Sequence, residues 1–341
     1  MVAVQFLTLD PADFVYGEVA SVAPGVRRVI ARNPSKFTYH GTGTYIIGGD
    51  RNGGGDVAVI DPGPALDAHR DALAAALAGA TVRAILVTHC HSDHSPLSAW
   101  LSAETGAPTF AFGPHADDAW DIGDDPPDNP PDETPDGDAT DVPTEPVIEE
   151  SIDRAFAPDV AVGTGDVVME GGGWRITALH TPGHTSNHTC FAFTDGDRRT
   201  LFTGDHVMGW STTVVAPPDG DMAAYMESLR MVAARHDDVA IPTHGPPIPD
   251  PGSFVAGLVD HRVEREQQVL DVVRRGVDRV PAMVEILYAD VRRELHKPAR
   301  RSVLAHLVKL VDDGRVALDR AAGATAAADD RPRLDDTFRP V

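Results

Sequence analysis

The sequence predicts an α/β fold followed by a small helical domain, and three observations support this prediction. In the first 257 residues, short apolar runs typical of strands alternate with longer stretches of helical periodicity. From about residue 254 the strand pattern stops, and three helical stretches followed by a short strand give the outline of a winged helix. The length of 341 residues suits one large domain and one small one.

The predicted strands of the large domain are short apolar runs between connections rich in glycine and proline. They cover residues 44–49, 57–61, 84–88, 174–179, 188–193, 200–203 and 239–243. The helices predicted between them cover residues 65–78, 96–105 and 221–235. This alternation places residues 1–257 in the α/β class.

In the C-terminal part, helices are predicted at residues 254–275, 282–288 and 299–311, and a strand at 315–318. We assign residues 258–320 to a winged-helix-like domain. Residues 321–341 are rich in alanine and aspartate, and we expect a disordered tail.

Residues 117–153 form an acidic stretch within the large domain. They include 15 acidic residues and no basic one, with seven prolines between Pro126 and Pro146. Such a composition buries too little apolar surface to fold alone. We therefore expect a partly mobile surface insertion, with a lid or a partner-binding segment as the functional alternative.

Charge and cysteine content narrow the partners and the compartment. Residues 1–257 hold 13 Lys and Arg against 37 Asp and Glu, so this part carries nearly all of the excess negative charge of a chain whose net charge is −23. Such a surface repels a polyanion at long range, so we expect no stable DNA complex. No run approaches the roughly 18 apolar residues that span a bilayer, and the start shows no secretory signal. With only Cys90 and Cys190 present, we expect a cytoplasmic protein. We expect no membrane partner, and the sequence leaves open whether the protein forms a homodimer.

The sequence HCHSDH at residues 89–94 follows a predicted strand directly. In extended backbone, residues two apart face the same side, so His89 and His91 can reach one metal ion together. A turn after them would direct Asp93 and His94 toward a second ion. Imidazole and carboxylate ligands suit zinc, with manganese or iron as alternatives.

Three further candidate ligands follow predicted strands in the same way. His184 lies in TPGHT, Asp205 in FTGD and His244 in PTHG. Small residues beside each candidate allow the backbone to turn sharply near a metal. Apart from His188, the remaining histidines lie in no such context, and we interpret them as core or surface residues.

Together these motifs resemble the full motif set of the metallo-β-lactamase superfamily over about residues 30–250. The resemblance implies a four-layer αβ/βα sandwich with two metal ions at the rim between two mixed sheets. It implies His89, His91 and His184 as ligands of the first ion, Asp93, His94 and His244 as ligands of the second, and Asp205 as the bridge. The true β-lactamases of the family lack this bridging aspartate, so we do not expect antibiotic hydrolysis.

Two segments, TGDHVMGWSTTVV at 203–215 and YMESL at 225–229, are similar to the lactamase-like protein beta 2 family. That family also ends in a small winged-helix-like domain, which residues 302–318 resemble. Its animal members are endoribonucleases, so the resemblance implies a phosphodiester substrate such as single-stranded RNA.

The candidate catalytic residues are Asp93, Asp205 and His188. Two metal ions that share a water lower its pKa, and the second oxygen of Asp93 could orient that nucleophile. His188 and Asn187 could donate hydrogen bonds to a substrate oxygen, or they could simply satisfy backbone groups at a strand start. Asp61 resembles a family aspartate near the site, and we expect it to orient a ligand histidine.

Three functions remain open from the sequence. The first is phosphodiester hydrolysis, the second is thioester hydrolysis of the glyoxalase II kind, and the third is a non-catalytic protein that binds nucleic acid. The substrate would accordingly be RNA or a small molecule. Basic residues cluster in the winged-helix region, where they could contact RNA or belong to a domain that only covers the active site: Arg292, Arg293, Lys297, Arg300 and Arg301.

Overall fold

The computed structural model describes residues 4–49, 54–116, 120–123, 151–319 and 331–341. The chain forms two compact units. The first contains Met1–Asp117, Glu149–Val215 and Asp219–Val263, and the second contains Asp118–Ile148, Ala216–Pro218 and Glu264–Val341. The division falls within one continuous helix, α4 (Pro251–Arg274), because its apolar positions serve a core in each unit.

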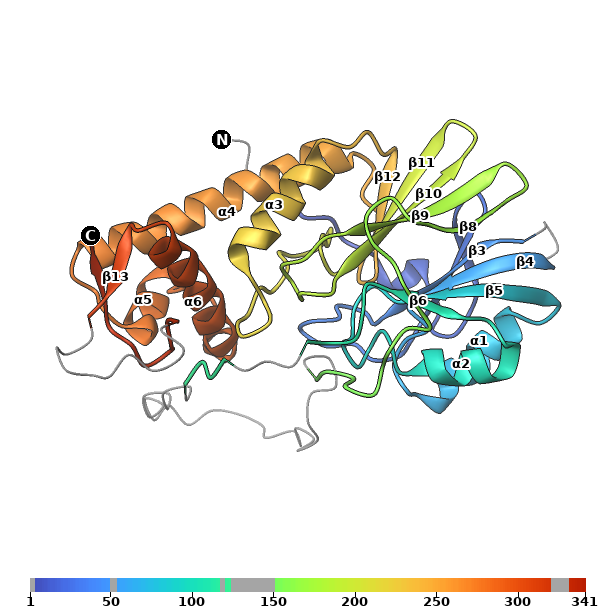
Figure 1. The fold of residues 1–341 in the computed structure, drawn as a ribbon, viewed down its shortest axis with the longest axis horizontal. Coiled ribbons are helices and arrows are strands. Elements are labelled where there is room, and N and C mark those ends of the chain that lie inside the picture. Colours follow the sequence, from blue (N-terminus) through green and yellow to red (C-terminus); the bar gives the residue numbers. More distant parts are fainter. Residues whose placement is uncertain (1–3, 50–53, 117–119, 124–150, 320–330) are drawn as a thin grey trace. The chain divides into compact units, whose positions relative to one another are not determined.

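The first unit is built on two mixed sheets (Figure 1). The seven-stranded sheet has its strands in chain order: β1 (Ala20–Ala23), β2 (Val26–Ile30), β3 (Gly43–Gly48), β4 (Gly55–Ile60), β5 (Ala80–Leu86), β6 (Thr109–Ala111) and β7 (Val160–Ala161). The five-stranded sheet has the order β12 (Val239–Pro242), β11 (Arg198–Gly204), β10 (Thr189–Asp195), β9 (Trp174–His180) and β8 (Val167–Gly171). Each sheet combines antiparallel pairs with parallel ones, as the expected fold requires.

Alternation along the strands separates two cores, because successive side chains of a strand point to opposite faces. On β3, Tyr45 and Ile47 face the five-stranded sheet, where they meet Phe191, Phe202 and other apolar residues. Ile46 lies on the opposite face with Val57, Val59 and Ile85, against the two helices α1 (Asp67–Ala76) and α2 (Leu97–Thr105). The helix α3 (Met222–Ala233) buries Tyr225 and Leu229. The α/β class predicted from the sequence is confirmed.

The second unit has a core of its own. It contains the rest of α4, then α5 (Val280–Leu287), α6 (His296–Asp312) and a two-stranded sheet of β13 (Val316–Leu318) and β14 (Phe338–Pro340). The expectation of a disordered tail over 321–341 is wrong for residues 331–341, because Leu334 and Phe338 are buried in this core and Phe338 pairs with Leu318. Residues 320–330 lie outside the described part of the chain.

Most of the acidic stretch expected to be an insertion also lies outside the described residues, but both of its ends are described. Trp120 is buried, and the backbone carbonyl of Ile122 accepts a hydrogen bond from the Leu334 amide in the second unit. At the other end, Ile152 forms a β-bridge with His91, and the Asp153 amide donates to the Cys90 carbonyl. Residues 151–153 therefore pair with the backbone of the HCHSDH loop, and the prediction of a surface insertion over the rest of the stretch stays a prediction.

Within the described residues, no helix combines the length and apolar character needed to cross a membrane.

Candidate metal centre

The structure brings the seven candidate ligands together at the ends of four strands. The HCHSDH loop follows β5, and His184 lies in the turn between β9 and β10. Asp205 directly follows β11, and His244 lies two residues beyond the end of β12. Because neighbouring strands end at the same edge, side chains from distant parts of the chain meet there.

The first group consists of three imidazoles. His89 Nε2 lies 2.9 Å from His91 Nδ1, and His184 Nε2 lies 3.3 Å from the same atom. Burial lowers the pKa of His91 to about 3 and the pKa of His89 well below its usual value, and the neighbouring imidazoles act in the same direction. Rings that stay neutral with their nitrogens converging on one point form a donor set for a cation.

The second group combines Asp93 with two histidines. The carboxylate Oδ2 of Asp93 lies 3.3 Å from His94 Nε2 and 3.2 Å from His244 Nε2. Burial opposes charge on His244, but Asp205 and Asp93 outweigh it and raise its pKa to about 10. The pKa of His94 is likewise raised well above its usual value. These carboxylates therefore require positive charge close by, which protons on the two rings or a metal ion can supply.

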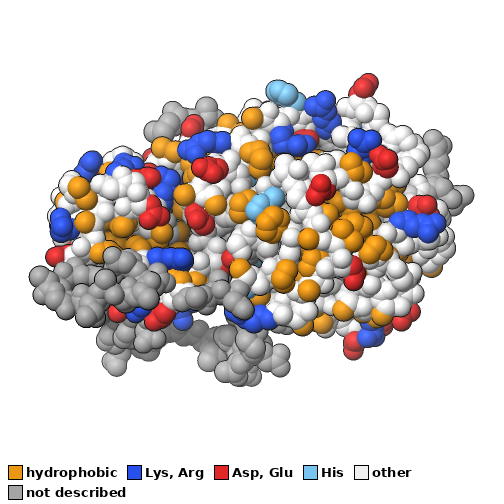
Figure 2. All heavy atoms as spheres, in the orientation of Figure 1, with side chains coloured by type: hydrophobic (Ala, Val, Ile, Leu, Met, Phe, Trp, Pro, Cys, Tyr) orange, Lys and Arg blue, Asp and Glu red, His pale blue; other side chains and the backbone are white. Residues whose placement is uncertain are grey.

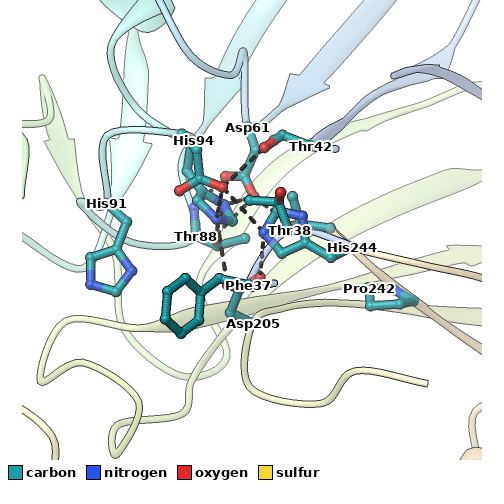
Figure 3. A network of polar contacts seen from close by, with 12 residues as sticks. Phe37, Thr38, Thr42, Asp61, Thr88, His91, His94, Asp205, Pro242 and His244 are labelled. Carbon is teal, nitrogen blue, oxygen red and sulfur yellow. Dashed lines mark hydrogen bonds and ion pairs between the residues drawn. The ribbon is translucent and has the colours of Figure 1, made fainter. Parts of the chain in front are cut away.

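Asp205 contacts both groups, as Figure 3 shows for His94 and His244. Its Oδ2 lies 3.6 Å from His94 Nε2 and 4.0 Å from His184 Nε2, while its Oδ1 lies 3.4 Å from His244 Nε2. Both Asp205 Oδ1 and His94 Nε2 are buried without a hydrogen-bond partner. Buried polar atoms are seldom left unpaired, so these two atoms fit a site that holds a metal ion.

A protein acceptor orients four of the five candidate histidines through the nitrogen that faces away from the cluster. Three of these acceptors are the Thr88 hydroxyl for His89 Nδ1 at 3.0 Å, the Val214 carbonyl for His184 Nδ1 at 2.7 Å and the Gly41 carbonyl for His244 Nδ1 at 3.2 Å. The fourth is the Asp61 carboxylate, 2.9 Å from His94 Nδ1. Such partners fix the tautomer and direct the other nitrogen, with its lone pair, toward the metal.

Asp61 holds more than His94. Its Oδ1 accepts the Thr88 amide at 2.8 Å, and its Oδ2 also accepts the hydroxyls of Thr88 and Thr243, both at 2.9 Å. Its backbone lies in the left-handed region, with φ of 47°, which few residues other than glycine adopt. Asp61 therefore ties the β4, β5 and β12 strand ends to one carboxylate, and it orients a candidate ligand histidine as the sequence predicted.

The sequence analysis missed the threonines that support the site. Thr88 and Thr243 each come directly before a candidate ligand histidine, and Thr42 donates to Asp93 Oδ2 at 2.9 Å. The first two could have been found, because a hydroxyl placed directly before a ligand at two strand ends is a repeated local signal. Thr42 carries no such signal.

His188 and Asn187 both have protein partners. His188 Nδ1 lies 2.9 Å from the Thr181 hydroxyl, and its Nε2 accepts the Asp205 amide at 3.2 Å. Asn187 Nδ2 donates to Cys90 Sγ at 2.8 Å and to the Gly113 carbonyl at 3.1 Å. These contacts link the ligand loops to one another, and a contact of His188 with substrate stays a prediction.

The cluster is open to solvent on one side. His89, Asp93, His94 and His244 are at most 1% exposed, whereas His91 is partly exposed and the side chains of His184 and Asp205 are 9% and 11% exposed. Near the loop that carries His184, the exposed ring of Phe112 stacks on His180 with 3.7 Å between centroids. The part of the cluster nearest the surface is therefore formed by His91, His184 and Asp205.

Two mixed sheets packed face to face, with a histidine and aspartate cluster at their strand ends, define a metal-dependent hydrolase. The chain belongs to the metallo-beta-lactamase superfamily, whose family model matches residues 41–244. A second model, the beta-lactamase associated winged helix domain, matches residues 280–323.

Two relatives illustrate the similarity, which extends over most of the chain. The beta-lactamase-like protein 2 homolog of Drosophila melanogaster is 30% identical over 316 residues, covering 89% of this chain and 94% of the relative. The resemblance to that family seen in the sequence is thereby confirmed. An atrochrysone carboxyl ACP thioesterase of Aspergillus chevalieri is 29% identical over 318 residues, covering 90% of this chain and 87% of the relative.

Solved structures support the fold. A beta-lactamase domain protein from Burkholderia ambifaria superposes with a TM-score of 0.68 at 20% identity, covering 97% of this chain and 96% of the other. A metallo-beta-lactamase family protein from Thermus thermophilus superposes with a TM-score of 0.66 at 22% identity, covering 94% of this chain and 100% of the other. The four-layer sandwich with a C-terminal winged helix is confirmed.

Proposed function

We propose that this protein hydrolyses an acyl thioester with two metal ions, which we take to be zinc. The observation that carries the two-metal site is the overlap of three potential metal-binding groups: His89, His91 and His184; Asp93, His94 and His244; and His89, His94 and Asp205. The third group shares His89 with the first and His94 with the second. Asp205 is therefore the residue that would contact the ions held by both of the other groups. An all nitrogen and oxygen donor set rich in imidazole suits zinc.

When bound, such ions supply a water acidic enough to attack at neutral pH and stabilise the oxygen that gains negative charge. The remaining work falls to the protein. Asp205, held by His188 through its backbone amide, would fix the spacing of the two groups. Asp93 is held through one oxygen by Thr42, and its other oxygen would orient the nucleophile. The partial exposure of His91 would leave the substrate an approach on that side.

Two observations favour a thioester as the substrate. Relatives that match about nine tenths of the chain carry the name atrochrysone carboxyl ACP thioesterase. In addition, hydrophobic side chains gather over the strands of the first unit on the face shown in Figure 2, and exposed Phe112 and Val160 belong to neighbouring parts of the chain around β6 and β7. An apolar acyl group suits such a surface, whereas an acidic first unit disfavours a polyanion.

Phosphodiester hydrolysis is the second candidate, because Arg292, Arg293 and Lys297 are exposed on the winged-helix unit and could contact RNA. The support is smaller than the sequence suggested. Arg300, expected to belong to the same basic cluster, is only 8% exposed, since it lies on the face of α6 that packs into the core.

A direct test compares a short-chain acyl thioester, bis-p-nitrophenyl phosphate and single-stranded RNA as substrates for the zinc-loaded protein. We expect thioester turnover well above that of either phosphodiester, and its loss in Asp205→Ala. Preferential cleavage of a phosphodiester, lost in the same variant, would contradict the thioester assignment. Thioester turnover near the wild-type rate in a folded, zinc-loaded Asp205→Ala would contradict the role proposed for Asp205.

A further inference from the structure

Arg262, on α4, is a buried cation whose position calls for an explanation. It is 4% exposed, and among the described residues it forms no ion pair with a carboxylate. Its Nη2 donates a hydrogen bond to the Thr213 carbonyl, and its guanidinium lies over the ring of Tyr225, 5.4 Å from the centroid. Burying a guanidinium is unfavourable unless it gains strong contacts, and Arg262 has a backbone carbonyl and the Tyr225 side chain in place of a carboxylate, which suggests a role beyond packing.

The carbonyl that Arg262 holds belongs to a residue that closes the loop carrying Asp205. The Thr213 hydroxyl lies 2.7 Å from the Asp205 carbonyl and 3.1 Å from the His206 carbonyl, to which it can donate. The Tyr225 hydroxyl also donates to the His206 carbonyl, at 3.0 Å. Arg262 therefore contacts two of the residues whose side chains hold the backbone of Asp205 and His206, and the third, His188, accepts the Asp205 amide.

The next residue along the chain connects the same loop to a second candidate ligand. The Val214 carbonyl accepts the hydrogen bond from His184 Nδ1 at 2.7 Å, and the peptide unit that joins Thr213 to Val214 includes the carbonyl bound by Arg262. Movement of this peptide unit would therefore displace two neighbouring groups: the Thr213 hydroxyl that holds Asp205 and the Val214 carbonyl that holds His184. His184 and Asp205 follow different strands, and this loop joins them in addition to His188, which accepts the Asp205 amide at 3.2 Å.

We propose that Arg262 is a positioning residue for the metal centre: from α4 it fixes the 205–214 loop, and through that loop the orientations of Asp205 and His184. The residue touches neither the cluster nor a substrate. Its effect is therefore on how tightly and in what geometry metal is held. Residues that hydrogen-bond directly to ligands change metal affinity by roughly 10- to 100-fold, and Arg262 acts one contact further out, on the supports of two candidate ligands at once. The proposal rests on the metal binding proposed above.

The test uses Co²⁺, whose visible spectrum reports ligand geometry, added to the metal-stripped full-length protein. Arg262→Met introduces an apolar side chain of similar length and removes every hydrogen-bond donor of the guanidinium. Arg262→Lys keeps the positive charge. Arg265→Met is the matched control: Arg265 lies one turn further along α4, donates to the Leu287 carbonyl at 3.0 Å and lies 4.4 Å over the ring of Tyr288, all within the second unit. Thr213→Val is a second variant that cuts the link to Asp205 and leaves the carbonyl in place.

We expect Arg262→Met and Thr213→Val to weaken Co²⁺ binding at least tenfold in competition with a chelator and to change the spectrum, with partial recovery in Arg262→Lys. Arg265→Met should lower the melting temperature of the metal-free protein while its Co²⁺ affinity stays within about twofold. Wild-type affinity and spectrum in a folded Arg262→Met would overturn the proposal, even if that variant melts earlier. If Arg262→Met does not fold, wild-type Co²⁺ affinity and a wild-type spectrum in Thr213→Val would overturn the proposal. Failure of the wild-type protein to bind Co²⁺ would instead contradict the proposed metal site itself.

Discussion

Replacing Asp61 by asparagine tests how the second layer of contacts supports the centre. The Asp61 carboxylate accepts four hydrogen bonds: one at Oδ1, from the Thr88 amide, and three at Oδ2, from Thr88 Oγ1, Thr243 Oγ1 and His94 Nδ1. An asparagine can present only one oxygen. If the oxygen takes the Oδ2 position, its amide nitrogen faces the Thr88 N–H, and two donors stand about 2.8 Å apart.

The expected loss of folding stability follows from the number of hydrogen bonds that asparagine cannot make. The least disruptive orientation loses one buried hydrogen bond to a charged acceptor, which lowers the stability by about 2–3 kcal/mol. It also removes the negative charge next to His94, so the imidazole becomes less basic and a weaker ligand. We expect metal affinity to fall roughly 10- to 100-fold, as for other partners of ligand histidines.

The assay is a urea unfolding curve of the metal-free protein together with zinc affinity from chelator competition. Asp159→Asn is the matched control, because Asp159 also accepts an amide and a hydroxyl from one threonine, Thr109, but through a single oxygen at an exposed site. That variant should change both quantities little, since an asparagine oxygen can replace the one in use. An Asp61→Asn protein with unchanged stability and unchanged zinc affinity would refute the reasoning.

Two further predictions concern stability. Burial lowers the pKa of His69 to about 4, so as the pH falls this ring is protonated in the unfolded chain before it is protonated in the folded protein. The free energy of unfolding should therefore fall by up to about 3 kcal/mol between pH 6.5 and pH 4. Unfolding curves of the wild type and His69→Gln should converge over this range, and a constant difference between them would contradict the assignment. Phe338→Ala should destabilise the winged-helix unit by about 3–5 kcal/mol because it leaves a cavity in a closed core. The exposed neighbour Arg339→Ala should have little effect, and equal effects of the two changes would show that β14 does not complete that core.

The sequence predicted the parts of the fold that local pattern determines. Each predicted strand of the first unit is present within a few residues, because β-branched runs between glycines and prolines carry that signal locally. The strand β2 was missed, since its central Arg27 and Arg28 read as polar although Arg28 is 5% exposed. The strand β14 was missed because it pairs with β13 across a stretch of alanine and aspartate.

The candidate ligands could be read from the sequence for a similar reason. The HCHSDH loop contains four of them within six residues, and the other three each follow a strand. The contacts that orient these ligands could not be predicted from the sequence, because each contact joins residues far apart in the chain. Thr42 is 51 positions from Asp93, and Arg262 is 49 positions from Thr213. No local pattern distinguishes such a threonine or arginine from others on a loop or helix.

The central claim is that seven side chains hold two metal ions around Asp205, and metal stoichiometry tests it most directly. Metal-stripped protein dialysed against zinc and then measured by elemental analysis should contain two equivalents per chain, and Asp205→Ala should contain fewer while remaining folded. One equivalent or none in the wild-type protein, or two in Asp205→Ala bound as tightly as in the wild type, would contradict the account.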